Sequence, residues 1–207
     1  TYVRPFPISI DPSLWKKTGD SIAETKTVRR SLGLTTEKMI FGVDRLDYTK
    51  GIPDRLRAYA RLLDRYPEWR TRVTMVQVGA ASREHLSTYQ NLMQEVQHCV
   101  DEINAKYRAD GWRPVIYRPQ HHQPEQVAQM YRAADVCVVS SLHDGMNLVA
   151  KEFIAARNDE RGVLVLSEFT GAARELEHAV QVNPYALDSF ADAFNRALLM
   201  PPEEQRR

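Results

Sequence analysis

Two short loops of this 207-residue chain bring cations and carboxylates together in a pattern suited to binding an anion. The first, DRLDYTKG at 44–51, follows an apolar run and carries Arg45 and Lys50 just before a predicted helix. Unpaired amides and the helix dipole favour negative charge at a helix N-terminus, so a phosphate or diphosphate is the expected guest. The alternative is that Arg45 pairs with Asp44 or Asp47 and that Lys50 is only solvated.

The second loop, SSLHDGMNLVAKEF at 140–153, follows the apolar run VCVV. We expect Gly145 to adopt a positive φ, so that the amides of residues 146–149 open a helix and form a second anion-binding end. Glu152, one turn later, could accept hydrogen bonds from ribose hydroxyls, and Asp144 lies at the mouth of the loop. Two such ends facing one ligand favour a diphosphate. In the alternative, Asp144 or Asn147 is a simple N-cap and Glu152 an exposed helix residue.

Two further loops offer weaker signals. Arg83, in GAASREHL at 79–86, is a cation on a first helical turn, where it either reaches an anionic ligand or is simply exposed. His121 and His122 either line a nucleotide pocket or cap the next helix; adjacent side chains diverge, so no metal site is predicted. The chain lacks the glycine-rich dinucleotide fingerprint and the GxSxG, HExxH and GxxxxGK[ST] motifs.

Short apolar runs alternate with segments whose apolar residues recur at helical spacing. The loops described above connect these predicted strands and helices, which therefore position them. Continuous apolarity indicates strands buried on both faces of a parallel sheet, at 39–43, 73–78, 114–117, 136–140, 163–167 and 180–182. Helical stripes fall within 52–63, 86–107 and 187–198. The alternation predicts an α/β fold with a doubly wound, mostly parallel sheet, in which ligands lie beyond the carboxyl ends of the strands. Those ends carry the unusual loops.

The composition is that of a globular protein. Lys and Arg number 28 against 27 Asp and Glu, and 43% of residues are hydrophobic, which excludes disorder as the main state. The net charge of +1 provides no polybasic field for nucleic acid or an anionic membrane. No apolar run approaches the length of a spanning helix. Cys99 and Cys137 fall in a helix and a core strand, where inert packing is expected, and we predict a reduced, cytoplasmic protein.

Six strings extend these motifs along the chain: GVDRLDYTKGIPDRLRAYARLL, SREHLSTYQNL, INAKYRADGW, LHDGMNLVAKEF, GVLVLSEFTGAA and VNPY. In this order they closely resemble the trehalose-6-phosphate synthase family of retaining glycosyltransferases. That family folds as two facing Rossmann-like domains (GT-B) with the active site in the cleft. The resemblance implies that 38–200 is the Rossmann-like donor-binding domain, 1–37 a strand and connector from a missing N-terminal domain, and 201–207 the start of a truncated C-terminal helix.

The resemblance also implies roles for the loop residues. Arg45 and Lys50 would hold the diphosphate of UDP-glucose, Glu152 would bind the ribose, and Asp144 would contact hydroxyls of the transferred glucose. The implied donor-binding residues are Arg45, Lys50, His122, Asp144, Gly145, Met146, Asn147, Leu148, Val149 and Glu152, of which Asp144, Arg45 and Lys50 are also catalytic. Arg83 would contact the acceptor phosphate. His122 stands near the nucleobase where the family often carries Phe, which leaves uridine, guanosine and adenosine open as the donor base.

The implied reaction moves glucose, with retention, from UDP-glucose or another nucleotide-glucose to glucose 6-phosphate, giving trehalose 6-phosphate and a nucleoside diphosphate. No metal or other cofactor is implied, because Arg45 and Lys50 would offset the diphosphate charge, and Asp144 would orient the sugar without becoming a covalent nucleophile. Alternatives are a related transferase with glycerol 3-phosphate or a cyclitol phosphate as acceptor, and a non-catalytic nucleotide-sugar-binding homologue. We expect the isolated chain to be inactive, since half a cleft cannot align donor and acceptor. A face left uncovered by the missing domain leaves homo-oligomer formation open.

Overall fold

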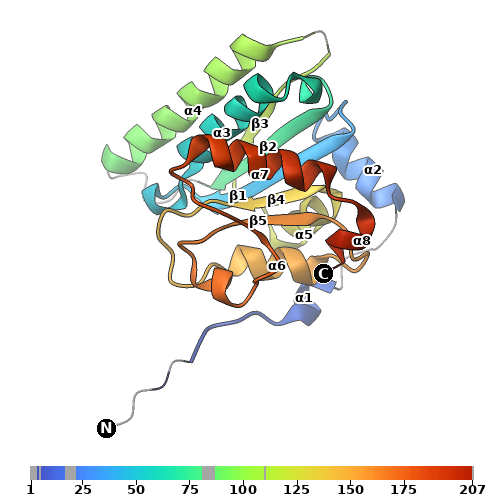
Figure 1. Cartoon of the computed structure of the whole chain (residues 1–207), viewed down its shortest axis with the longest axis vertical. Helices are drawn as coiled ribbons and strands as arrows, with labels where there is room; N and C mark the ends of the chain where they lie inside the picture. Colours follow the sequence, from blue (N-terminus) through green and yellow to red (C-terminus); the bar gives the residue numbers. More distant parts are fainter. Residues whose placement is uncertain (1–3, 5, 17–21, 81–86, 110, 207) are drawn as a thin grey trace.

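A six-stranded parallel sheet forms the centre of the computed structural model, which describes residues 4, 6–16, 22–80, 87–109 and 111–206 (Figure 1). The strands, in chain order, are β1 (Lys38–Arg45), β2 (Val73–Ala80), β3 (Val115–Arg118), β4 (Val136–Val139), β5 (Val163–Ser167) and β6 (Val180–Val182). Their spatial order is β3-β2-β1-β4-β5-β6, and every pairing is parallel. This confirms the predicted α/β doubly wound sheet. The strand order reverses between β1 and β4, where such sheets bind ligands.

Helices cover both faces of the sheet (Figure 1). One face packs against α3 (Ile52–Arg65), α4 (Ser87–Tyr107) and α7 (Leu187–Leu199), and the other against α2 (Ile22–Ser31), α5 (Pro124–Ala133) and α6 (Leu148–Ala156). The two cores follow the alternation of β-strand side chains: Ile40 of β1 joins the first core, while Met39 and Phe41 join the second. Double burial explains why the strands are recognisable as unbroken apolar runs.

Short elements complete the fold. They are α1 (Pro12–Lys16), α8 (Pro202–Gln205) and the 3₁₀ turns η1 (Tyr48–Lys50), η2 (Pro67–Trp69) and η3 (Gly171–Arg174). Among the described helices, none combines the length and the apolarity needed to cross a bilayer. Cys99 and Cys137 are both buried free thiols, as their predicted packing positions require.

The segment 1–37 differs from its expected form. Its described residues contain helices α1 and α2 and no strand. The helix α2 is rich in charged residues, and Arg29 holds it in place by donating to the carbonyl oxygens of Ala133, Thr36 and Glu37. A strand forms only along a neighbouring strand's edge, and the described part of this segment pairs with neither β3 nor β6. Its assignment to another domain stays a prediction.

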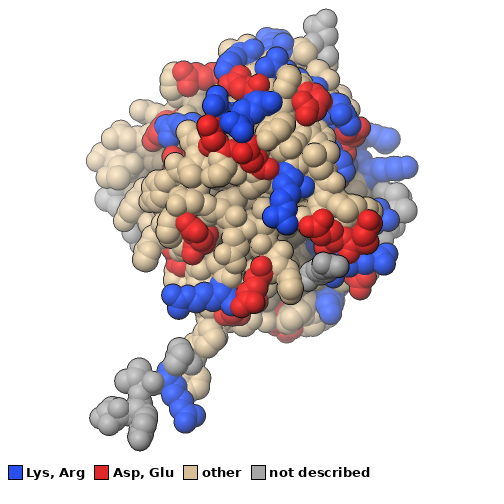
Figure 2. All heavy atoms as spheres, in the orientation of Figure 1, with Lys and Arg blue, Asp and Glu red and all other residues tan. Residues whose placement is uncertain are grey.

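Charges on the visible face are intermixed. Figure 2 shows basic and acidic side chains side by side on the face that carries α7, without a broad area of one sign. Ion pairs between α3 and α7 account for part of this pattern, with Arg61 paired to Asp188 and Arg65 to Asp192. This face therefore offers no extended basic surface for a polyanion.

Candidate functional site

The loops after β1 and β4 meet at the point where the strand order reverses. Lys50 at the end of η1 donates to Asp144 in the β4 loop, with 2.7 Å between Lys50 Nζ and Asp144 Oδ2. A backbone bond of 2.7 Å from the Leu142 amide to the Thr49 carbonyl holds the two loops together. Both charged side chains are 17% exposed. The structure thus joins two residues that the sequence singled out in separate loops.

Local chemistry shapes the β1 loop. Asp47 caps η1 by accepting bonds from the Thr49 amide (2.9 Å) and hydroxyl (2.8 Å). Burial opposes these bonds, but they hold the pKa of Asp47 below its usual value. Gly51 has a φ of 60°, and a Cβ there would lie only 2.5 Å from the Ser140 carbonyl oxygen, so glycine is required on both counts. The loop therefore presents Lys50 from a tightly fixed turn.

Arg45, at the end of β1, is exposed and makes no ion pair with any residue in the described part of the chain. Neither alternative ion pair of Arg45 forms: Asp44 pairs with a buried arginine on α3, and Asp47 accepts hydrogen bonds from Thr49 and feels Arg45 only as a nearby charge. Arg45 ends β1 and Lys50 ends η1, so both lie at the carboxyl edge of the sheet. Two cations therefore lie next to the start of α3, where the helix dipole also favours an anion.

The β4 loop is built around Asn147. Its side-chain oxygen accepts from the Ala150 amide at 3.2 Å and caps α6, while its Nδ2 donates to Asp144 Oδ2 at 3.1 Å. The positive φ expected at Gly145 occurs instead at Asn147, with a value of 77°. Asparagine tolerates this backbone region, and here its side chain gains the cap in return. Of the two alternative caps, the structure therefore selects Asn147 and leaves Asp144 facing Lys50.

The β5 loop packs directly on this turn. The Gly171 amide donates to the Asp144 carbonyl at 3.0 Å, and the Ala172 amide to the Met146 carbonyl at 2.8 Å. A Cβ on Gly171 would overlap the Gly145 carbonyl group. Leu148 and Val149 follow as the first residues of α6, where helix amides have no intrahelical acceptor. The expected helix end next to Asp144 is therefore present.

Asp144 is ionised at neutral pH. Burial favours its neutral form, but the bonds from Lys50, Asn147 and the Met146 amide outweigh burial and keep the pKa of Asp144 below its usual value. The ammonium group of Lys50 has three donors, of which Asp144 takes one. The site thus combines a fixed carboxylate with a cation that retains hydrogen-bonding capacity.

Glu152 is half-buried on α6, one turn after the helix begins. Burial raises its pKa above the usual value, although the Tyr131 hydroxyl opposes this by donating to Glu152 Oε2 at 3.0 Å. Tyr131 is itself fully buried and packs edge-on against Phe41 and Phe153. The interpretation of Glu152 as a freely exposed helix residue is therefore wrong; it is a carboxylate held in place from one side.

The sequence interpretation missed a buried network beneath the two loops. Arg55 of α3 has no exposed surface; its Nη1 donates to Asp44 at 2.7 Å and to Gln77 at 2.8 Å, and its Nε donates to the Ser140 hydroxyl at 2.9 Å. Gly42 leaves space for the guanidinium, since a Cβ there would overlap it. The sequence carries two signals of this network: Arg55 is a charge within the helical segment 52–63, and Gln77 is a polar residue within the apolar run VTMVQV.

The remaining candidates are Arg83 and the two histidines that follow β3. Arg83 falls outside the described residues. His122 follows β3 at the same edge of the sheet, and its Nδ1 lies 2.9 Å from the Gln120 carbonyl oxygen. Neither histidine caps the next helix, because α5 is preceded by Gln123, whose amide donates to Gln126. A position near a nucleobase stays a prediction for His122.

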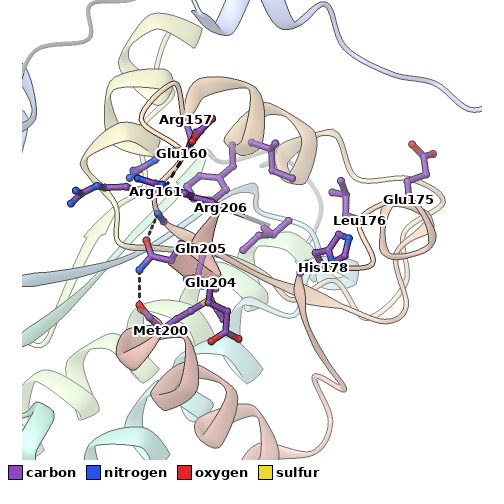
Figure 3. Close-up of a pocket in the computed structure, with 16 residues that line it drawn as sticks. Arg157, Glu160, Arg161, Glu175, Leu176, His178, Met200, Glu204, Gln205 and Arg206 are labelled. Atoms are coloured by element: carbon purple, nitrogen blue, oxygen red, sulfur yellow. Dashed lines mark hydrogen bonds and ion pairs between the residues drawn. The ribbon is translucent and has the colours of Figure 1, made fainter. Parts of the chain in front are cut away.

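A separate cavity of about 360 Å³ lies at the opposite, amino end of β5 (Figure 3). It is bordered by α6 and α8, and Gln205 closes one side by accepting from the Gly162 amide and donating to the Met200 carbonyl. Arg157 in its wall is engaged by Asp159 and by backbone carbonyls, including that of Ala134. This cavity is not the predicted site.

Comparison with known proteins agrees with the geometry of the site. The sequence profile of glycosyltransferase family 20 matches residues 1–207. The chain is 41% identical over 204 residues to alpha,alpha-trehalose-phosphate synthase [UDP-forming] A of Dictyostelium discoideum, and 42% identical over 201 residues to trehalose-6-phosphate synthase of Salmonella arizonae. These matches cover 97% of this chain, but only 27% and 42% of the two relatives. The chain thus spans less than half the length of either relative.

Solved structures extend the comparison to the fold. A structure described as trehalose-6-phosphate from E. coli bound with UDP-2-fluoro glucose superposes with a TM-score of 0.90 at 39% identity. An alpha,alpha-trehalose-phosphate synthase (UDP-forming) from Burkholderia xenovorans, in complex with glucose-6-phosphate, gives 0.90 at 37% identity. Each match covers 97% of this chain and 45% of the other. The sheet order, the paired loops and these matches together place the chain in glycosyltransferase family 20.

Proposed function

We propose that the chain is the donor-binding part of a retaining transferase that moves glucose from UDP-glucose to glucose 6-phosphate and releases trehalose 6-phosphate and UDP. The observation that carries the proposal is the 2.7 Å contact of Lys50 with Asp144 at the point where the strand order reverses. It sets a cation for the diphosphate next to a carboxylate for the sugar. Relatives described with a UDP-glucose analogue and with glucose 6-phosphate support this choice of substrates.

We assign separate parts of the donor to separate residues of the site. Lys50 keeps two donors beyond the one that Asp144 takes, and exposed Arg45 adds a second cation. Together they offset the roughly two negative charges of a sugar diphosphate and stabilise the charge that develops on the leaving group. The first amides of α6 would assist. We therefore propose that no metal ion is needed, which predicts that a chelator leaves UDP binding unchanged.

Asp144 orients the transferred glucose. It already accepts bonds from Lys50 and Asn147, and its lowered pKa keeps it ionised, so it can accept hydrogen bonds from sugar hydroxyls. A carboxylate fixed in this way suits orientation of the sugar. Glu152 uses one oxygen for the Tyr131 hydroxyl and has the other available for ribose hydroxyls. Arg83 is proposed to contact the acceptor phosphate.

The test is a transfer assay on the natural polypeptide that carries this chain. UDP-glucose and glucose 6-phosphate should give an α,α-linked disaccharide phosphate, and Asp144→Asn should lower kcat more than it raises KM for the donor. Glycerol 3-phosphate offered in place of glucose 6-phosphate should give no product. Transfer to glycerol 3-phosphate alone would assign the chain to a related transferase, and UDP binding without any transfer would identify a non-catalytic nucleotide-sugar-binding protein.

A further inference from the structure

Ser140, the first residue after β4, lies between the buried Arg55 and the turn that carries Lys50. It has no exposed surface. Its oxygen accepts from Arg55 Nε at 2.9 Å and lies 3.2 Å from the Lys50 carbonyl oxygen and 3.1 Å from that of Gly51. Because Arg55 occupies a lone pair of the hydroxyl, the single proton of Ser140 is directed toward these two carbonyl groups.

The network fixes the turn from below. Arg55 cannot shift, because Asp44 and Gln77 hold its Nη1 and its guanidinium fills the space over Gly42. Ser140 passes this constraint to the backbone of residues 50 and 51. One of these two carbonyls belongs to Lys50, whose ammonium group must reach both Asp144 and a diphosphate.

We propose that Ser140 and Arg55 are positioning residues, which set the Lys50 ammonium group at the distance that diphosphate binding requires. This inference rests on the proposed function. Loss of the Ser140 hydroxyl removes the side-chain donor to the Lys50 carbonyl and the acceptor of Arg55 Nε, and it leaves the Gly51 carbonyl with the Arg55 amide alone, so the turn can adopt other conformations. The expected defect is confined to the diphosphate, because Glu152 and the β3 loop are not part of this network.

Ser140→Ala is the main variant. The matched control is Tyr59→Phe, which removes a fully buried hydroxyl from the same helix, α3. That hydroxyl donates to the carbonyls of Val73 and Pro114 at the opposite end of the sheet from Ser140. Calorimetric titration with UDP and ligand-observed NMR with uridine separate diphosphate binding from nucleoside binding. Urea unfolding confirms that each variant is folded.

We expect Ser140→Ala to weaken UDP binding about ten-fold, or about 1.4 kcal/mol, and to leave uridine binding unchanged. Tyr59→Phe should change the free energy of unfolding without changing the affinity for UDP or for uridine. Arg55→Lys provides a second test, because an ammonium group keeps the charge opposite Asp44 but loses the planar fork; it should give the same selective loss.

The outcomes distinguish the inference from the function on which it rests. Absence of UDP binding by the unaltered protein would overturn the proposed function, and the positioning role with it. UDP binding that Ser140→Ala leaves unchanged would overturn the positioning role alone. Equal losses of UDP and uridine binding would show general damage to the site, and would also overturn it.

Discussion

The buried pair of Arg55 and Asp44 allows a quantitative test of how the site is supported. Arg55→Met removes the guanidinium and leaves Asp44, whose side chain is 2% exposed, without its partner at 2.7 Å. An uncompensated buried charge costs about 3–5 kcal/mol, and the substitution also leaves Gln77 Oε1 and the Ser140 hydroxyl without their donor. For a chain of this size, we expect a drop in Tm of about 6–20 °C.

The assay is urea unfolding of the two single variants and of the double variant Asp44→Asn with Arg55→Met. The second change removes the stranded charge, so the double variant should recover about 2 kcal/mol or more relative to Arg55→Met. The control is Arg57→Met on the same helix, whose side chain is 45% exposed and pairs with Glu95 and Asp54. It should cost no more than about 1 kcal/mol. Equal losses for Arg55→Met and Arg57→Met would refute the reasoning.

Two other predictions concern the β4 loop and α6. Burial raises the pKa of Glu152 in the folded protein, so the protonated carboxyl group stabilises the fold below the unfolded pKa, and this stabilisation is lost as the pH rises through the folded pKa. Glu152→Gln should therefore raise Tm at pH 7 but not at pH 4. An equal rise at both pH values would contradict this cause. Asn147 has a φ of 77° and caps α6. Asn147→Gly and Asn147→Ala both lose the cap and the bond to Asp144, but the alanine also strains the backbone, so urea unfolding should find the alanine variant less stable by about 1 kcal/mol. Equal stabilities would argue against strain at this position.

Much of the fold could be predicted because double burial leaves a clear trace in the sequence. The strands at 163–167 and 180–182 have the expected bounds, and β3 begins one residue later than expected, at Val115. Loops at the carboxyl ends of such strands must face one edge, so both the DRLDYTKG and the HDGMN loops were correctly placed there. The segment before β1 was harder, since a predicted strand needs a partner that the sequence does not specify.

The contacts within the site depend on strand order, which apolar runs do not encode. Lys50 and Asp144 are 94 positions apart, and they meet only because β1 lies beside β4. The buried role of Arg55 was missed because a single charge within a helical stripe resembles an exposed residue until its partners are known. The positive φ was assigned to Gly145 because glycine adopts it at no cost, whereas Asn147 gains a helix cap by adopting it.

Binding of UDP tests the central claim most directly. The unaltered protein, Lys50→Ala and the control Lys106→Ala, which removes an exposed lysine of α4 paired with Asp64, are titrated calorimetrically in the presence of a chelator. We expect the unaltered protein and the control to bind UDP alike. Lys50→Ala should bind it about 10–100 times more weakly, as expected for the loss of a charge-assisted hydrogen bond. Equal affinity of Lys50→Ala and the unaltered protein, or no UDP binding by the folded unaltered protein, would contradict the account.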